Sequence, residues 1–327
     1  MTLAAVPRAR RRLVPALAFG VACAANAAPG DPLAWLQRAA QASRQASYEG
    51  TYVHVNGDNT STVKVTHVAA NGEETERIEP LDDASLEIVR HNDETFCRFP
   101  DAKTVRLDPR IASRFFPNLF ALPAEAIARS YDVKLGKTER VLGYQCQWLR
   151  LEPRDGTRYP QAVCAEAASG LVLRAKTYSD QKQVIEQYTF TELRMGPQVA
   201  RTDLRTLFRT RNRQWISDGQ PRDDATATDS GWMVQRVPAG FQKIAELKRN
   251  LPGRPSPVAQ LVYTDGLATL SVFVEPNATP PRAADAGSED GSTTFFARPV
   301  GDHVVSVLGE VPPATAQQVA RSVARRP

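Results

Sequence analysis

The stretch LGYQCQWLRLEP-RDG-TRYPQAVC, residues 142–164, predicts two antiparallel strands joined by a tight turn. A three-residue loop that ends in glycine is typical of a hairpin in which a type I turn is followed by a left-handed residue. With Pro153 opposite Thr157, this register places Cys146 directly opposite Cys164, at a separation that a disulfide can close. We therefore expect a hairpin with a Cys146–Cys164 disulfide; two buried free cysteines are the alternative.

Alternation of apolar and polar residues, the period of a β-strand, recurs on both sides of this hairpin. It predicts a meander of about nine antiparallel strands at 48–55, 62–69, 74–79, 86–90, 95–99, 142–153, 157–164, 170–178 and 184–194. Residues 32–47 have helical spacing, with Asp31 as the N-cap and Pro32 at the first position. A helical, proline-framed insert is expected at 109–130. Little helix is therefore available to cover the apolar face of the sheet.

A second, smaller unit follows the meander. Residues 217–230 are polar and Asp-rich without apolar periodicity, which is typical of a linker. Strand patterns resume near 232–237, 241–248, 258–264, 267–274, 294–298 and 303–308, and Pro312-Pro313 begins a terminal helix. We expect an α+β fold: a large antiparallel domain with helical cover over 28–213, a linker over 214–230 and a small α+β domain over 231–327. The large sheet either closes on itself or leaves a concave apolar face.

The first 27 residues have the composition of a secretory signal peptide. Arginines at positions 8, 10, 11 and 12 precede an apolar run from Leu13 to Cys23 and an Ala25-Asn26-Ala27 end. The run is too short to span a bilayer. We expect cleavage after residue 27 and a mature chain outside the cytoplasm, with acylation of Cys23 as the alternative. Without this segment the formal charge of +5 falls to about +1, which gives no global field for nucleic acid.

Catalytic and metal-binding motifs are absent from the sequence: no G-x-S-x-G, H-E-x-x-H or G-x-G-x-x-G occurs. Cys97, the cysteine left without a partner, has no histidine beside it. His54 and His67 fall on the first predicted hairpin, where they can meet across the strands. A hydrolase built on them would also need a nucleophile, so cross-strand polar pairing is favoured. We expect no enzyme, no metal site and no cofactor.

A basic stripe follows the predicted meander, because arginines recur every four residues at Arg201, Arg205, Arg209 and Arg213. On a helix over 201–215 they share one face. Guanidinium groups bind phosphate and carboxylate groups bidentately, so this face is a candidate anion clamp. An ordinary solvated face is the alternative.

The stretch SRFFPNLFALP, residues 113–123, concentrates apolar side chains between two prolines. It is either part of the core or the lining of a cavity beneath a helical cover. Apolar cavities allow soluble proteins to hold lipid chains, since each buried methylene contributes about 0.8 kcal/mol. The candidate cavity residues are Phe115, Phe116, Leu119, Phe120, Leu122, Ile127 and Trp148.

Several spaced motifs resemble the MucB/RseB family of periplasmic regulators. They are RDGTRY at 154–159, LVYTDGL at 261–267 followed by Ser271-Val272, and GEVPP at 309–313. Trp232 followed by VPAGF at 237–241 is similar to the start of that family's small domain. The likeness runs in order along the whole mature chain.

This resemblance implies a periplasmic negative regulator of an envelope-stress sigma factor. Such a protein binds the periplasmic part of a single-pass inner-membrane anti-sigma factor and shields it from the first regulated protease. The resemblance also implies a half-barrel similar to the LolA/LolB carriers, with a cavity that senses lipopolysaccharide or lipoprotein acyl chains. Candidate partner-binding residues are Tyr263, Asp265, Gly266 and Leu267. A homodimer is left open, and the alternative function is a lipid or lipoprotein carrier without a regulatory partner.

Overall fold

The computed structural model describes residues 30–82, 87–92, 94–98, 104–107, 115–197, 199, 226–227, 229–249, 256–276 and 285–327. The predicted signal peptide and the helix predicted over 201–215 lie outside the described residues, and so does the start of the insert.

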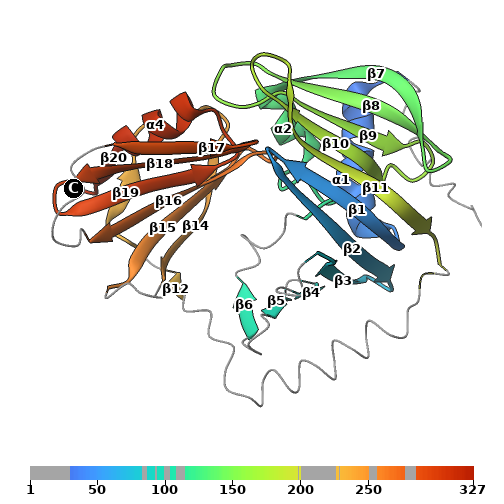
Figure 1. Cartoon of the computed structure of the whole chain (residues 1–327), viewed down its shortest axis with the longest axis horizontal. Coiled ribbons are helices and arrows are strands. Elements are labelled where there is room, and N and C mark those ends of the chain that lie inside the picture. The colour runs from blue at the N-terminus through green and yellow to red at the C-terminus, as the bar shows by residue number, and fades with distance from the viewer. Residues whose placement is uncertain are drawn as a thin grey trace, which may run out of the picture.

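One antiparallel sheet of eleven strands forms the large domain, in the order β6-β5-β4-β3-β2-β1-β11-β10-β9-β8-β7 (Figure 1). The strands are β1 Tyr48–Asn56, β2 Asn59–Ala70, β3 Glu73–Pro80, β4 Glu87–His91, β5 Glu94–Arg98, β6 Thr104–Leu107, β7 Tyr131–Val141, β8 Tyr144–Pro153, β9 Gln161–Glu166, β10 Val172–Tyr178 and β11 Val184–Met195. Among the described residues β6 and β7 do not pair with each other, so the sheet is open. This confirms the predicted fold class of a large open antiparallel domain beside a smaller one.

The sequence prediction missed two strands, β7 and β6. In β7 the apolar positions Tyr131, Val133 and Leu135 alternate, and a bulge between Leu135 and Thr138 then shifts the phase. The strand β6 is only four residues long. Of the insert predicted as helical, the described part is irregular from residue 115 to 123 and helical only in α2, Ala124–Ser130.

The hairpin that carries the disulfide forms with a different register from the one predicted. Cys146 and Cys164 are joined by a disulfide with a Cα–Cα distance of 5.5 Å, as expected. However, Cys146 lies opposite Glu166, and Cys164 lies opposite Trp148. The connection is not a three-residue turn, because β8 ends at Pro153 and β9 begins at Gln161. Residues 154–160 form a longer loop, and its Arg158 side chain reaches Asp265. Cys97 is buried and free.

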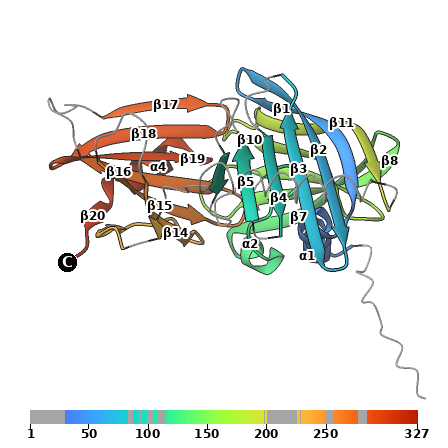
Figure 2. The ribbon, with the colours of Figure 1, turned by 90° about the horizontal axis from the view of Figure 1, so that it is seen from below.

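Helix α1, Pro32–Gln45, packs on β7, β8 and β10 and begins as predicted, because the Asp31 carboxylate accepts a hydrogen bond from the Leu33 backbone N–H at 3.0 Å. Its buried residues Leu36, Ala39 and Ala42 belong to the large-domain core. Figure 2 shows α1 and α2 close to β7, and both helices contact this strand. Among the described residues, no helix has the length and apolar character needed to cross a membrane.

The small domain is built on a seven-stranded antiparallel sheet in the order β12-β14-β15-β16-β19-β18-β17. Its elements are β12 Thr226–Ala227, β13 Trp232–Val234, β14 Gln242–Arg249, β15 Val258–Thr264, β16 Thr269–Pro276, β17 Ala286–Asp290, β18 Thr293–Val300, β19 His303–Gly309, α4 Pro313–Arg321 and β20 Val323–Arg325. Helix α4 follows Pro312 as predicted and packs on β18 and β19. Thr226 and Ala227, placed in the linker by the sequence, pair with β14 and so belong to the second sheet.

We expect the disulfide to stabilise the large domain measurably. It links residues 18 positions apart, so the double variant Cys146→Ser/Cys164→Ser should lose about 3 kcal/mol of unfolding free energy. Urea titration followed by circular dichroism measures this loss. A reductant should lower the wild-type midpoint to that of the variant and leave the variant unchanged; an unaffected wild type would contradict the prediction.

Candidate functional site

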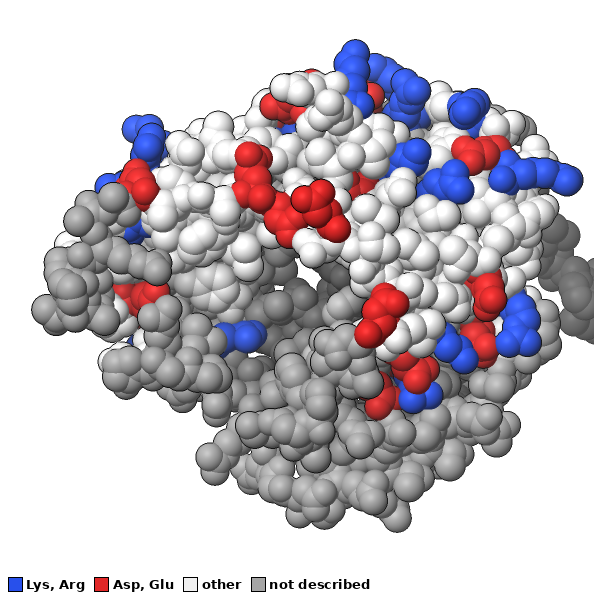
Figure 3. Space-filling model, in the orientation of Figure 1, with Lys and Arg blue, Asp and Glu red and all other residues white. Residues whose placement is uncertain are grey.

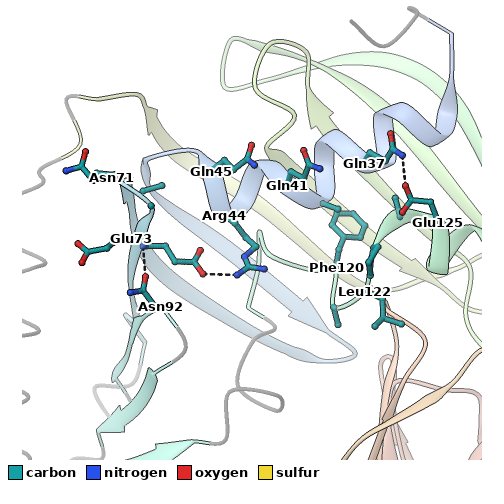
Figure 4. A pocket seen from close by; sticks show the side chains of 18 residues that line it. Gln37, Gln41, Arg44, Gln45, Asn71, Glu73, Asn92, Phe120, Leu122 and Glu125 are labelled. Carbon is teal, nitrogen blue, oxygen red and sulfur yellow. Dashed lines mark hydrogen bonds and ion pairs between the residues drawn. The ribbon is translucent and has the colours of Figure 1, made fainter. Parts of the chain in front are cut away.

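An open cavity lies in the large domain between α1, the β2–β3 turn and the segment that leads into α2 (Figure 4). Its volume of about 1050 Å³ is large enough for a lipid acyl chain or a short peptide. Apolar, amide and charged groups share its walls. The lining residues are Gln37, Ala40, Gln41, Arg44, Gln45, Asn92, and the runs 69–74 and 120–125.

Polar groups on opposite walls of the cavity are fixed by hydrogen bonds (Figure 4). One face of α1 presents a row of primary amides at intervals of four, Gln37, Gln41 and Gln45. Gln37 Nε2 donates to Glu125 Oε1 at 2.6 Å, which ties α1 to α2. Arg44 pairs with Glu74 at 3.2 Å, and the Glu74 backbone N–H donates to Asn92 Oδ1 at 2.9 Å. These contacts hold α1 to both neighbouring walls.

A buried histidine and a half-buried glutamate lie close together at the β2–β3 wall. His67 is fully buried, and its Nδ1 must donate to the Ala46 carbonyl at 2.7 Å, because that oxygen can only accept. Its Nε2 therefore faces Glu74 Oε2 at 3.6 Å. Burial alone would raise the pKa of Glu74, but the neighbouring His67 side chain and the charges of Arg90 and Arg44 lower this pKa to about 2. Glu74 stays ionised and anchors the wall of the cavity.

The seven candidate cavity residues separate into two groups. Phe120 and Leu122 line the cavity. Phe115 and Leu119 are half-buried against the large-domain core. Phe116 is 1 % exposed and packs on the rings of Tyr52 and Tyr188, with centroid distances of 4.9 and 5.3 Å. The stretch 115–122 is therefore part core and part cavity wall.

Ile127 and Trp148 belong to the core rather than to the cavity wall. Ile127 is fully buried in α2. Trp148 is 8 % exposed, and its Nε1 donates to Glu139 Oε2 at 2.7 Å. Neither residue lines this cavity, so their role at a lipid site stays a prediction.

The two histidines of the first hairpin do not meet. In the β1–β2 register His54 lies opposite Ser61, and His67 lies opposite Tyr48. His54 Nε2 is 2.9 Å from Glu186 Oε1, and its ring stacks on Tyr188 at 4.1 Å. The predicted anion clamp of Arg201, Arg205, Arg209 and Arg213 lies outside the described residues.

The two domains meet around Arg158, a side chain that is 1 % exposed. It comes from the loop between β8 and β9, and its Nη1 donates to Asp265 Oδ2 of the small domain at 2.8 Å. Its Nε donates to Asp155 Oδ1 at 3.2 Å, and its Nη2 donates to the Ala239 carbonyl of the small domain. Tyr131 OH also donates to Asp265 Oδ2, at 3.0 Å. The guanidinium is therefore enclosed by groups from both domains.

The β15–β16 turn that carries Asp265 inserts into the large domain. Leu267 is 2 % exposed and belongs to the large-domain core although it follows the small-domain strand β15. The Ala121 backbone N–H donates to the Gly266 carbonyl at 2.8 Å. Gly266 has φ +102°, and a Cβ there would lie 2.7 Å from Ile127 Cγ1 and 3.0 Å from Leu122 Cβ. Glycine is required at this close approach.

A second contact joins the tips of two hairpin turns. Asn59 Nδ2 donates to Asp290 Oδ2 at 2.6 Å, and the Ser292 backbone N–H donates to Asn56 Oδ1 at 2.8 Å. Asp and Glu side chains gather near the line between the domains on the face shown in Figure 3. This acidic patch is electrostatically unfavourable for a polyanion.

All four candidate partner-binding residues are buried in this arrangement of the domains. Tyr263 is 5 % exposed, Asp265 1 % and Leu267 2 %, and Gly266 lies against the large domain. Tyr263 belongs to the small-domain core, and a partner could contact the other three only after the domains separate. The role of all four in partner binding stays a prediction. The sequence did not identify Arg158 as a functional residue; the only signal was its place in the RDGTRY motif.

A cavity in one domain, with a second domain fixed against its wall, defines a two-domain binding protein. Among the described residues no cluster of His, Cys, Asp and Glu could hold a metal ion. The MucB/RseB N-terminal domain family matches residues 31–208, and the MucB/RseB C-terminal domain family matches residues 226–324. The chain belongs to the MucB/RseB family.

Known proteins agree with this assignment over nearly the whole chain. The sigma factor AlgU regulatory protein MucB of Pseudomonas aeruginosa is 32 % identical over 296 residues, covering 88 % of this chain and 89 % of MucB. A chain from a Pseudomonas aeruginosa MucA/MucB complex superposes with TM-score 0.72 and 30 % identity. The match covers 91 % of this chain and 99 % of that chain. A structure of MucB superposes with TM-score 0.64 and 28 % identity, covering 90 % and 97 %. Membership of a family of regulatory proteins confirms the prediction that this chain is not an enzyme.

The lowered pKa of Glu74 predicts a pH dependence of stability. Because its folded pKa of about 2 lies below the ordinary 4.5, ionised Glu74 stabilises the fold above about pH 5. That contribution is lost as the pH falls toward 2. Glu74→Gln should therefore lower the unfolding free energy at pH 7 by about 1 kcal/mol after allowance for solvent screening, with no difference near pH 2.

Thermal unfolding of both proteins between pH 2 and 7 measures this difference. Glu192→Gln, at an exposed position of β11, is the matched control and should follow the wild type. A constant difference at every pH would contradict the prediction, because it would reflect packing rather than charge.

Proposed function

We propose that this protein is a periplasmic negative regulator of an envelope-stress sigma factor. In this proposal it binds the periplasmic part of a membrane-anchored anti-sigma factor and shields that segment from regulated proteolysis. The observation that carries the proposal is the match of nearly the whole chain to MucB from a MucA/MucB complex. The Cys146–Cys164 disulfide supports an oxidising compartment such as the periplasm.

The arrangement of the two domains also supports this partner. The chain superposes on MucB from two structures with MucA at TM-scores of 0.72 and 0.71, and on MucB alone at 0.64. We propose that the docked arrangement described above is the one that binds the anti-sigma segment.

We propose in addition that the cavity beside α1 takes an acyl chain of lipopolysaccharide or of a lipoprotein. Its volume and the apolar side chains of Phe120 and Leu122 suit a hydrocarbon chain, and the amides of α1 suit a polar headgroup at the mouth. For the lipid to regulate binding of the anti-sigma segment, the two ligands must favour different arrangements of the domains. By linkage each ligand weakens binding of the other by the same factor, typically about 5- to 150-fold.

Calorimetric titration of residues 28–327 with the periplasmic segment of the anti-sigma factor tests the regulator. We expect saturable binding that lipopolysaccharide weakens at least fivefold, while lipopolysaccharide stripped of its acyl chains does not weaken it. A triacylated lipopeptide in a parallel titration separates the two lipid sources. A regulated protease should cleave the segment more slowly when this protein is present and no lipid is added.

Two results would contradict the proposal in different ways. Lipid uptake without binding of the segment would leave the lipid carrier as the function. Binding of the segment that neither lipid changes would leave a regulator without a lipid sensor.

A further inference from the structure

The wall of the cavity and the site at which the small domain docks are the same stretch of chain. Residues 120–125 line the cavity. From the same stretch, the Ala121 N–H bonds the Gly266 carbonyl, and Leu122 lies against Gly266. Figure 4 shows Leu122 at the edge of the cavity, next to the ribbon of the small domain. One layer of side chains therefore separates a ligand in the cavity from the β15–β16 turn.

This turn is rigid enough to move as one body. Asp265 Oδ1 accepts hydrogen bonds from the backbone N–H groups of Leu267 and Ala268 at 2.9 and 2.8 Å. Thr264 Oγ1 accepts from the Gly266 N–H at 3.0 Å and donates to the Ala268 carbonyl at 2.8 Å. A displacement of Gly266 must therefore also displace the carboxylate of Asp265.

The other oxygen of that carboxylate holds the domains together. Asp265 Oδ2 accepts from Arg158 Nη1 at 2.8 Å and from Tyr131 OH at 3.0 Å, and both side chains belong to the large domain. Arg158 and Asp265 are each fully or almost fully buried, so water does not replace the ion pair while the domains are docked. Moving the turn separates these charges.

We propose that the Gly266 turn couples the cavity to the domain arrangement. An acyl chain that enters beside Phe120 and Leu122 displaces the wall, the wall displaces the turn, and Asp265 leaves Arg158. The small domain then leaves its docked position, and the arrangement that binds the anti-sigma segment is lost. This inference rests on the proposed function and names the element that carries its regulation.

Asp265→Asn tests the proposal at the pair itself. Asparagine keeps the shape of the side chain and an oxygen that can accept from Leu267 and Ala268, so the turn is preserved while the charge on Oδ2 is removed. Asp290→Asn is the matched control, because it makes the same substitution at the contact that does not touch the cavity wall. Circular dichroism and thermal unfolding check that both variants are folded.

The measured quantity is the factor by which lipopolysaccharide weakens binding of the anti-sigma segment in each protein. In Asp265→Asn we expect the lipid-free affinity for the segment to fall at least fivefold and the lipid effect to fall below twofold. Because the variant favours the undocked arrangement, it should bind lipopolysaccharide more tightly than the wild type. Asp290→Asn should retain the wild-type lipid effect. A full lipid effect in Asp265→Asn, or equal loss in both variants, would overturn the proposal.

Hydrogen exchange of the wild type with lipopolysaccharide gives a second test that needs no variant. The Ala121 N–H is protected by Gly266, so lipid should speed exchange in peptides covering 119–123 and 264–268 and leave α1 unchanged. Lipid binding without this change overturns the inference while leaving the proposed function intact. A wild type that binds no segment refutes both the inference and the proposed regulator. A wild type whose binding of the segment ignores lipid refutes the lipid sensor and this inference, but leaves the regulator.

Discussion

The arrangement of the two domains depends on the buried ion pair between Arg158 and Asp265. A guanidinium without access to water is stable only if carboxylates and carbonyls surround it, and here Asp155 and Ala239 complete the set. Removing one partner from such a pair costs about 3–5 kcal/mol, because the remaining charge is left uncompensated. The docked position is therefore favoured over slightly shifted ones, which would keep the burial but lose the pairing.

Apolar contacts beside the Arg158–Asp265 pair join the cores of the two domains. Leu267 follows a small-domain strand but packs in the large-domain core, and Gly266 allows the backbone to approach Ile127 closely. Close-packed interiors have discrete arrangements rather than a continuous range, so a wall displaced by a ligand favours a second arrangement over a small adjustment. The polar contact of Asn59 with Asp290 is exposed and contributes little by comparison.

Sequence periodicity predicted most strands, the first helix and the disulfide, because each depends on local spacing. It failed where local spacing is interrupted, as at the bulge in β7, and where a loop was read as a turn. The loop from 154 to 160 is long because Arg158 reaches into the other domain. Charged residues are seldom fully buried, so the sequence alone indicates an exposed arginine there. Its partner lies 107 positions away, and only the tertiary structure brings the two together.

The need for tertiary structure also explains why only some of the candidate cavity residues line the cavity. An apolar stretch such as 115–122 indicates burial but not what covers it, since core, ligand and neighbouring domain present the same apolar surface. The structure distributes the stretch among all three: Phe116 enters the core, Phe120 faces the cavity, and Leu122 lies between the cavity and the small domain. The YTDGL motif was assigned to partner binding because its residues resemble a family motif, yet they are buried where the domains join. A motif of this kind can act on a partner without touching it, by fixing the arrangement that the partner recognises.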